Sequence, residues 1–389
     1  MSIKETASAL FQTDRDHVSV YFAPGRVNLI GEHTDYNGGY VFPAALTKGT
    51  SMAIAKRSDQ TITFRSAQFD QIVTIDSTEL AYDKTHGWAN YPKGVLVELQ
   101  KQFGELPGLD FYFDGNIPNG AGLSSSASIE LVATYGVADL LSFSLTRTEM
   151  AFMCQRVEND YIGVNSGIMD QFAVANGQKN QALFLNCKTL DTELVPLELG
   201  AYKLVITNTN KRRGLADSKY NERRSECEAG VEKLRALFPA IETISDLTIE
   251  EWESSKHVIK DDVIVARLQH VVSENGRVQK AVSALKQNDL ETFGQCMLDS
   301  HKSLRDLYEV TGEELDVLFD LQGKEQGCIG TRMTGAGFGG CTISIVHEDH
   351  IKPFITNVST AYEKAIGWAP ECYVSDVGDG VKALEEATI

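Results

Sequence analysis

A glycine- and serine-rich stretch, residues 118–128 (PNGAGLSSSAS), has the composition of a loop that binds an oxyanion. It places two glycines and four serines directly before an apolar run, residues 129–141, that predicts a helix. Such a loop directs backbone N–H groups and a helix N-terminus at one point, which suits a phosphate. We interpret it as a nucleotide-binding loop; the alternative is a serine-capped helix start whose glycines serve a turn.

A buried carboxylate is predicted in the second helix after this loop. The capping box of Thr146 and Glu149 starts that helix, and its apolar stripe reaches Glu158 at a position where a core side chain is expected. A carboxylate buried alone would cost several kcal/mol, so Glu158 requires a partner. That partner is an Arg or Lys in the structural interpretation and a metal ion in the functional one.

Other polar residues complete a set suited to phosphoryl transfer. Asp170 follows Glu158 by twelve residues (170 − 158) across a Gly- and Asn-rich link, and Arg26 opens a polar stretch, residues 26–35 (RVNLIGEHTD). Phosphoryl transfer needs a phosphate cradle, Mg²⁺ ligands, a cation and a group beside the acceptor hydroxyl. Mg²⁺ needs only one or two protein oxygens, which Ser126 and Glu158 can supply. For each residue alone the alternative is a solvated surface position without a function, because exposed charges in loops are usually only solvated.

A third glycine-rich stretch contains a literal GxGxxG in Gly335, Gly337 and Gly340. A dinucleotide fingerprint follows a strand and opens a helix, whereas this one precedes the β-branched run CTISIV. We therefore expect close approach of the backbone to a ligand or to another backbone segment. A tight turn between a helix and a strand is the alternative.

The elements that position these residues divide into two groups. In the first part, a strand from residue 17 is expected to stop at Pro24 and Gly25, and the segments SMAIAKR, TITFRS and QIVTID predict an antiparallel meander. A helix over residues 91–103 and a strand FYFDG then lead into the phosphate loop. From about residue 181, strands ALFLNC and YKLVITN alternate with long helices expected near 217–237, 260–285 and 290–322. A last helix near 351–365 and a strand CYVSDV complete the pattern. We place the domain boundary there, giving domains 1–180 and 181–389.

Composition restricts the class of protein. A formal net charge of −18 argues against a nucleic-acid partner, because phosphate backbones require positive surface. Seven cysteines without a CxxC pair predict neither a disulfide framework nor a zinc site and favour a reduced, cytoplasmic compartment. No signal peptide and no run of eighteen apolar residues is present, so we expect no membrane association.

Three motifs resemble those of the GHMP kinases and, within them, the galactokinase family. GRVNLIGEHTDYNGG resembles the galactokinase signature, PNGAGLSSSAS the phosphate loop, and TGAGFGGC the third motif, in the family's order and across essentially the whole chain. The resemblance implies an α+β fold of two domains with the active site between them. The N-terminal domain would be a ribosomal-protein-like α/β domain and the C-terminal one a ferredoxin-like α/β domain, whose last strand can return to the first.

The resemblance also implies an activity and its residues. The activity is ATP- and Mg²⁺-dependent phosphorylation of the C1 hydroxyl of α-D-galactose, in galactose catabolism. Apart from the resemblance, we expect a monomer. Asp170 would accept the hydroxyl proton, Arg26 would stabilise the phosphoryl group, and Ser126 with Glu158 would hold Mg²⁺. The residues implied to bind the sugar are Glu32, His33, Thr34, Asp35 and Tyr220. Those implied to bind the nucleotide are Ser66, Trp88, Gly120, Ala121, Gly122, Leu123, Ser124, Ser125 and Ser126.

Two alternatives stay open. One is a kinase for another sugar, such as N-acetylgalactosamine or arabinose. The other is a non-catalytic sensor of galactose and ATP; such relatives lack a Ser and Ala pair in the phosphate loop, and here Ser126 and Ala127 are present.

Overall fold

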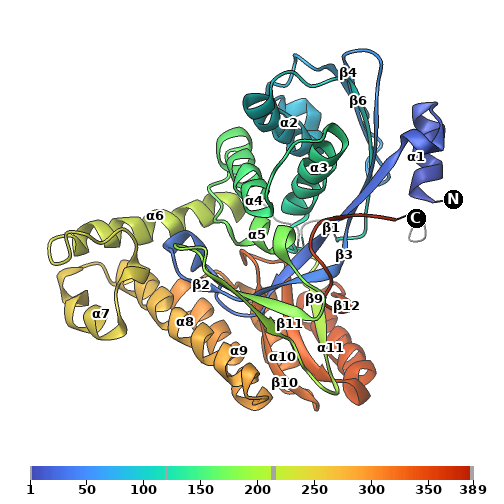
Figure 1. Cartoon of the computed structure of the whole chain (residues 1–389). Helices are drawn as coiled ribbons and strands as arrows, with labels where there is room; N and C mark the ends of the chain where they lie inside the picture. The colour runs from blue at the N-terminus through green and yellow to red at the C-terminus, as the bar shows by residue number, and fades with distance from the viewer. Residues whose placement is uncertain (1, 119–120, 212–215, 386–389) are drawn as a thin grey trace.

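A computed structural model describes residues 2–118, 121–211 and 216–385. It consists of two α/β parts, of which the earlier part of the chain forms one and the later part the other (Figure 1). The long strands β1 (Ser19–Asn28) and β3 (Pro43–Lys56) run from one part into the other. Within the described residues, no helix combines the length and apolar character that crossing a bilayer requires.

The first part is built on a six-stranded sheet among the described residues, in the order β13-β1-β3-β6-β4-β5. Its remaining strands are β4 (Thr61–Ser66), β5 (Val73–Asp76), β6 (Leu109–Gly115) and β13 (Lys382–Ala383). One face packs against helices α2 (Asn90–Phe103), α3 (Ser125–Leu141), α4 (Arg147–Arg156) and α5 (Met169–Asn176). Alternate residues of a strand point to opposite sides of the sheet, so β1 and β3 also present apolar side chains on the other face. Helix α1 (Ile3–Phe11) covers these side chains.

Two predictions for this sheet are wrong. Strand β1 does not stop at Pro24 but continues to Asn28, because the register shift between Pro24 and Arg26 accommodates the proline. Gly25 fits at this bulge, since a Cβ there would lie 2.7 Å from the carbonyl oxygen of Leu123. The meander is interrupted as well: β6 lies between β3 and β4, and β4 pairs with β6 in parallel.

The second part is built on an antiparallel sheet in the order β10-β11-β9-β12. Its strands are β9 (Tyr202–Asn208), β10 (Cys328–Thr334), β11 (Cys341–His347) and β12 (Glu371–Ser375). Helices α8 (Asp262–Lys286) and α9 (Leu290–Ser303) share one core with this sheet, and α10 (Glu313–Gln322) and α11 (Ile351–Ile366) share another. A small sheet joins β2 (Tyr40–Val41), β7 (Gln181–Asn186) and β8 (Thr192–Pro196).

The helices of the second part differ from the sequence prediction in two places. Residues 290–322 do not form one helix: α9 passes into a π-helical turn, Leu304–Tyr308, and the left-handed residues Glu309 and Gly312 separate it from α10. Helix α6 (Ala216–Leu234) was expected, whereas α7 (Ile249–Ser255) was not. The helix α1 was also missed, although Ser2 and Glu5 form a capping box at its start.

The two parts share residues across the expected boundary. Val27, Leu29, Ile30 and Phe42 pack in the core of the second part, beside α8 and β11. In the opposite direction, β13 returns to pair with β1. The polar stretch that starts at Arg26 is therefore held between the two parts.

Candidate active site

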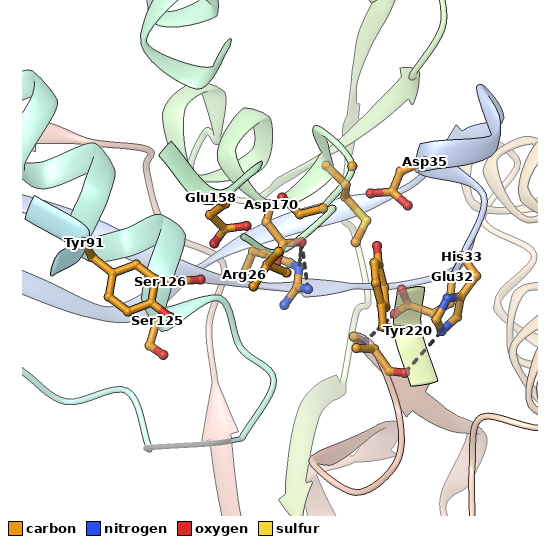
Figure 2. Close-up of a pocket in the computed structure, with 16 residues that line it drawn as sticks. Arg26, Glu32, His33, Asp35, Tyr91, Ser125, Ser126, Glu158, Asp170 and Tyr220 are labelled. Atoms are coloured by element: carbon orange, nitrogen blue, oxygen red, sulfur yellow. Dashed lines mark hydrogen bonds and ion pairs between the residues drawn. The ribbon is translucent and has the colours of Figure 1, made fainter. Parts of the chain in front are cut away.

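A cavity of about 270 Å³ brings most of the predicted residues together. Figure 2 shows Glu32, His33 and Tyr220 on one side, Ser126, Glu158 and Tyr91 on the other, and Arg26 with Asp170 between them. Predicted residues that line the cavity are Arg26, Glu32, His33, Asp35, Ser125, Ser126, Glu158, Asp170 and Tyr220. The lining also includes Tyr91, Val164, Ser166, Gly167, Met169, Gly335 and Ala336.

Arg26 and Asp170 form an ion pair at the centre of the cavity. Arg26 lies near the end of β1, and its Nε and Nη2 donate to Asp170 Oδ1 at 2.9 and 2.8 Å. Nη1 donates to the carbonyl oxygen of Gly122 at 2.7 Å. The guanidinium is buried, whereas the Asp170 side chain is 29% exposed and open to the cavity. The pair therefore joins the first turn of α5 to the phosphate loop.

The serine before α3 is used differently from a helix cap. Ser124 occupies the N-cap position with φ 60°, and its side chain makes no capping hydrogen bond. Its hydroxyl donates instead to Asp170 Oδ2 at 2.5 Å. Ala121 and Leu123 are buried in a core, and Gly120 lies outside the described residues. The structure thus does not support the alternative in which serine merely caps the helix.

Glu32 and Asp35 bring two carboxyl groups to the side of the cavity that lies opposite Ser126 (Figure 2). Glu32 Oε1 accepts from the N–H of Gly335 at 2.7 Å, and burial raises the pKa of Glu32 although Arg332 and Arg26 oppose this. Burial, with a further contribution from Asp170, raises the pKa of Asp35 to about 7. Gly167 leaves the space for Asp35, since a Cβ there would lie 1.9 Å from Asp35 Oδ2.

The two ring nitrogens of His33 are engaged with the protein. Nε2 lies 3.2 Å from the carbonyl oxygen of Ala336, which can only accept, so Nε2 carries the hydrogen. Nδ1 then accepts from the hydroxyl of Tyr36 at 2.8 Å. Burial lowers the pKa of His33 to about 3, so the ring is neutral. Its backbone is left-handed, with φ 61°.

Two other residues of the predicted sugar set differ in position. The Tyr220 ring, on α6, lies 5.5 Å from the His33 ring and 5.2 Å from that of Tyr36, centroid to centroid, and it lines the cavity. Thr34 is buried, and its hydroxyl lies 2.8 and 2.7 Å from the carbonyl oxygens of Gly31 and Tyr40. Its side chain therefore holds the turn together rather than facing the cavity.

Glu158 lies where α4 passes into a π-helical turn, Val157–Ile162, a geometry often found at functional sites. The residue is buried, and among the described residues no Lys or Arg forms an ion pair with it. Burial raises its pKa, against the effect of the Ser166 and Ser126 hydroxyls. A buried carboxylate beside a serine hydroxyl, without a protein cation, fits a hard metal ion that keeps most of its waters. No cluster of three or more acidic, His or Cys ligands occurs among the described residues.

A second cavity, of about 190 Å³, adjoins the first through Tyr91, Ser125 and Ser126. The predicted residues Ser66 and Trp88 line it. Sequence reasoning missed Phe69, whose ring stacks on Trp88 at 5.9 Å with an interplanar angle of 15°. The flat aromatic walls suit a planar base. The only signal for Phe69 was an aromatic residue in a polar loop, which is weak.

Three family models match the chain. They are the galactokinase galactose-binding signature over residues 8–56, the GHMP kinases N terminal domain over 90–178 and the GHMP kinases C terminal over 281–364. A galactokinase from Halalkalibacterium halodurans is 58% identical, covering 95% of this chain and 94% of that protein. One from Clostridium beijerinckii is 48% identical over 98% of both. The chain belongs to the galactokinase family.

Solved structures agree with this assignment. The crystal structure of Lactococcus lactis galactokinase complexed with galactose matches with a TM-score of 0.95 and 41% identity, covering 98% of this chain and 99% of that chain. The mevalonate kinase of Methanococcus jannaschii, at 19% identity and a TM-score of 0.68, shares the fold. The predicted GHMP kinase architecture and the predicted family are confirmed.

Proposed function

We propose that this galactokinase-family chain transfers the γ-phosphoryl group of ATP to the C1 hydroxyl of α-D-galactose. The observation that carries the proposal is the position of the Arg26–Asp170 pair. It lies between the polar sugar-side residues Glu32, Asp35 and Tyr220 and the loop that starts α3 (Figure 2). A reaction between a hydroxyl and a phosphate needs this order of groups.

The residues act together at the reacting atoms. Asp170 accepts the proton of the C1 hydroxyl as that oxygen bonds to the γ-phosphorus and the bond to the ADP oxygen breaks. Arg26 keeps Asp170 in place and offers positive charge to the phosphoryl oxygens. The hydroxyl of Ser124 fixes Oδ2 of the same carboxylate. Asp170 is thereby preorganised before substrate arrives.

The sugar and nucleotide bind on opposite sides of this pair. Glu32 and Asp35 accept hydrogen bonds from sugar hydroxyls, so a missing or misplaced hydroxyl leaves a buried carboxylate unpaired. We assign the second cavity, with Trp88 and Phe69, to the adenine base. Ser126 and Glu158 would hold Mg²⁺, which supplies positive charge to the β- and γ-phosphates when bound.

The test measures ADP release with galactose, N-acetylgalactosamine and arabinose supplied separately, in the wild type and in Asp170→Asn. We expect turnover with galactose above the other sugars. The variant should lose about a hundredfold or more in kcat while still binding galactose, because the amide keeps the shape but cannot take the proton. Galactose binding without turnover of any sugar would favour a sensor, and preference for another sugar would correct the substrate. Near-normal kcat in the variant would remove Asp170 as the base.

A further inference from the structure

Arg332 is a fully buried cation whose position the activity described so far does not explain. It lies near the end of β10, and its side chain is 0% exposed. Nη1 donates to the carbonyl oxygen of Asn28 at 2.8 Å and lies 3.4 Å from Glu32 Oε1. Nε and Nη2 have no hydrogen-bond partner within the described chain. A buried charge is costly unless it is paired, so this arginine requires a reason.

The carboxylate that Arg332 contacts belongs to the sugar side of the cavity. Glu32 lines the cavity, and its Oε1 is held at the same time by the N–H of Gly335. Glu32 is itself buried, at 2% side-chain exposure, so it cannot move into solvent to find another partner. Arg332 and Gly335 thus approach one oxygen of the carboxylate from the same segment, the end of β10 and the turn that follows.

Arg332 is the cation that contacts this carboxylate. Burial raises the pKa of Glu32, and the largest opposing contribution comes from Arg332, ahead of Arg26. Arg26 is already committed to Asp170 through two nitrogens. Without Arg332, Glu32 would lose the positive charge that most opposes the effect of its burial and one of the contacts that fix its direction.

We propose that Arg332 is a positioning residue for sugar recognition, which fixes the carboxylate of Glu32 so that it accepts a hydrogen bond from one particular sugar hydroxyl. The proposal rests on the proposed function, because it takes galactose as the ligand of the cavity. Strand β10, which precedes the third glycine motif, would then contribute to substrate selection through Arg332, although Arg332 does not line the cavity.

The experiment first finds the hydroxyl that Glu32 recognises. Calorimetry without nucleotide measures the affinity of wild type and Glu32→Gln for galactose and for each of its monodeoxy analogues. The hydroxyl whose removal weakens wild-type binding, but no longer matters in the variant, is the one that Glu32 contacts. Arg332→Lys should lose discrimination at that same hydroxyl, by about ten- to a hundredfold, the contribution of one hydrogen bond to a charged group.

Two further variants separate positioning from structure. Thr334→Val is the matched control: the Thr334 hydroxyl also bonds the backbone of Asn28 but does not contact Glu32. We expect it to lower thermal stability and to keep the discrimination. The double variant Arg332→Lys with Glu32→Gln should discriminate no worse than Glu32→Gln alone, because both act through one contact.

The outcomes are distinguishable from a failure of the proposed function. If the wild type does not bind galactose, the proposed function itself is wrong. If it binds and discriminates but Arg332→Lys keeps the same discrimination, or if Thr334→Val loses it equally, only the role of Arg332 is overturned. Should Arg332→Lys not fold, Arg332→Gln takes the same measurement, and failure of both to fold contradicts a role limited to Glu32.

Discussion

Burial changes the acidity of three carboxyl groups in the cavity. Burial raises the pKa of Asp35, Glu32 and Glu158, and for Asp35 the value reaches about 7. A ligand that hydrogen-bonds to the ionised Asp35 carboxylate therefore displaces a proton from this group, and binding becomes linked to pH.

Asp35 leads to a prediction about pH. Its pKa in the sugar-free protein is raised to about 7, and hydrogen bonds from sugar hydroxyls to the carboxylate lower it again. Galactose binding should then release a proton, and affinity should fall by roughly tenfold for each pH unit below 7. Calorimetry from about pH 5.5 to about pH 8.5, in buffers of different ionisation enthalpy, measures both the affinity and the number of protons released. Asp35→Asn should bind more weakly without the pH dependence, and an unchanged slope would assign the proton elsewhere.

Glu158 leads to a prediction about Mg²⁺. Changing Glu158 to Gln should raise the Mg²⁺ concentration for half-maximal activity by roughly tenfold or more, because the buried carboxylate is the charged ligand of the proposed pair. Glu149→Gln is the control, since Glu149 lies at the start of α4, before the π-helical turn that holds Glu158, and only completes a capping box. A Mg²⁺ titration of the Glu158 variant that matches the wild type would return Glu158 to a structural role.

The sequence predicted the types of these residues better than their contacts. Spacing and motif resemblance identified Arg26, Asp170 and Glu158, since polar residues beside glycine loops stand out. Arg332 gave no signal, because an arginine in a β-branched strand does not reveal that it is fully buried. Thr34 was expected at the sugar, but it bonds its own turn.

At the scale of elements, the link between the π-helical turn and α5 shapes the sugar side. Changing Gly167 to Ala should raise the galactose KM by roughly ten- to a hundredfold, because the added Cβ would overlap the Asp35 carboxylate. Steady-state kinetics measure this, and the ATP KM should change little. Gly276→Ala is the control, since that helical glycine has no atom within 4 Å of the new Cβ.

A second comparison tests the reason for that loss. In Asp35→Ala the carboxylate is gone, so adding Gly167→Ala should cost little more. Additive losses in the double variant would show that the glycine acts on something other than Asp35.

Local patterns predicted most elements but not their order in the sheets. Helices α2 and α11 begin and end close to the expected residues, and α4 begins at its predicted capping box, because capping and periodicity are local signals. The placement of β6 between β3 and β4 depends on contacts between strands that are far apart in the sequence, and no local pattern carries that information. The bulge at Gly25 likewise depends on Leu123, far along the chain.

At the scale of the whole molecule, the cavity lies where the two parts meet. Its polar lining comes from the end of β1, the start of α3, α5, α6 and the turn after β10. The predicted domain boundary at residue 180 marks the point where the pattern of helices and strands changes along the sequence. The sequence did not predict that Val27 and Phe42 pack in the core of the second part, because an apolar pattern shows that a residue is buried but not in which core.

The pairing of β13 with β1 has a consequence for the synthesis of this protein, because the two strands are made at different times. Tyr21 faces Ala383 across that pair, so β1 leaves the ribosome long before its partner is made. During that interval its outer edge offers unpaired backbone groups to any neighbouring extended chain. Until β13 is made, this edge of β1 is open to aggregation, and β13 then pairs with it at Tyr21 and Phe22.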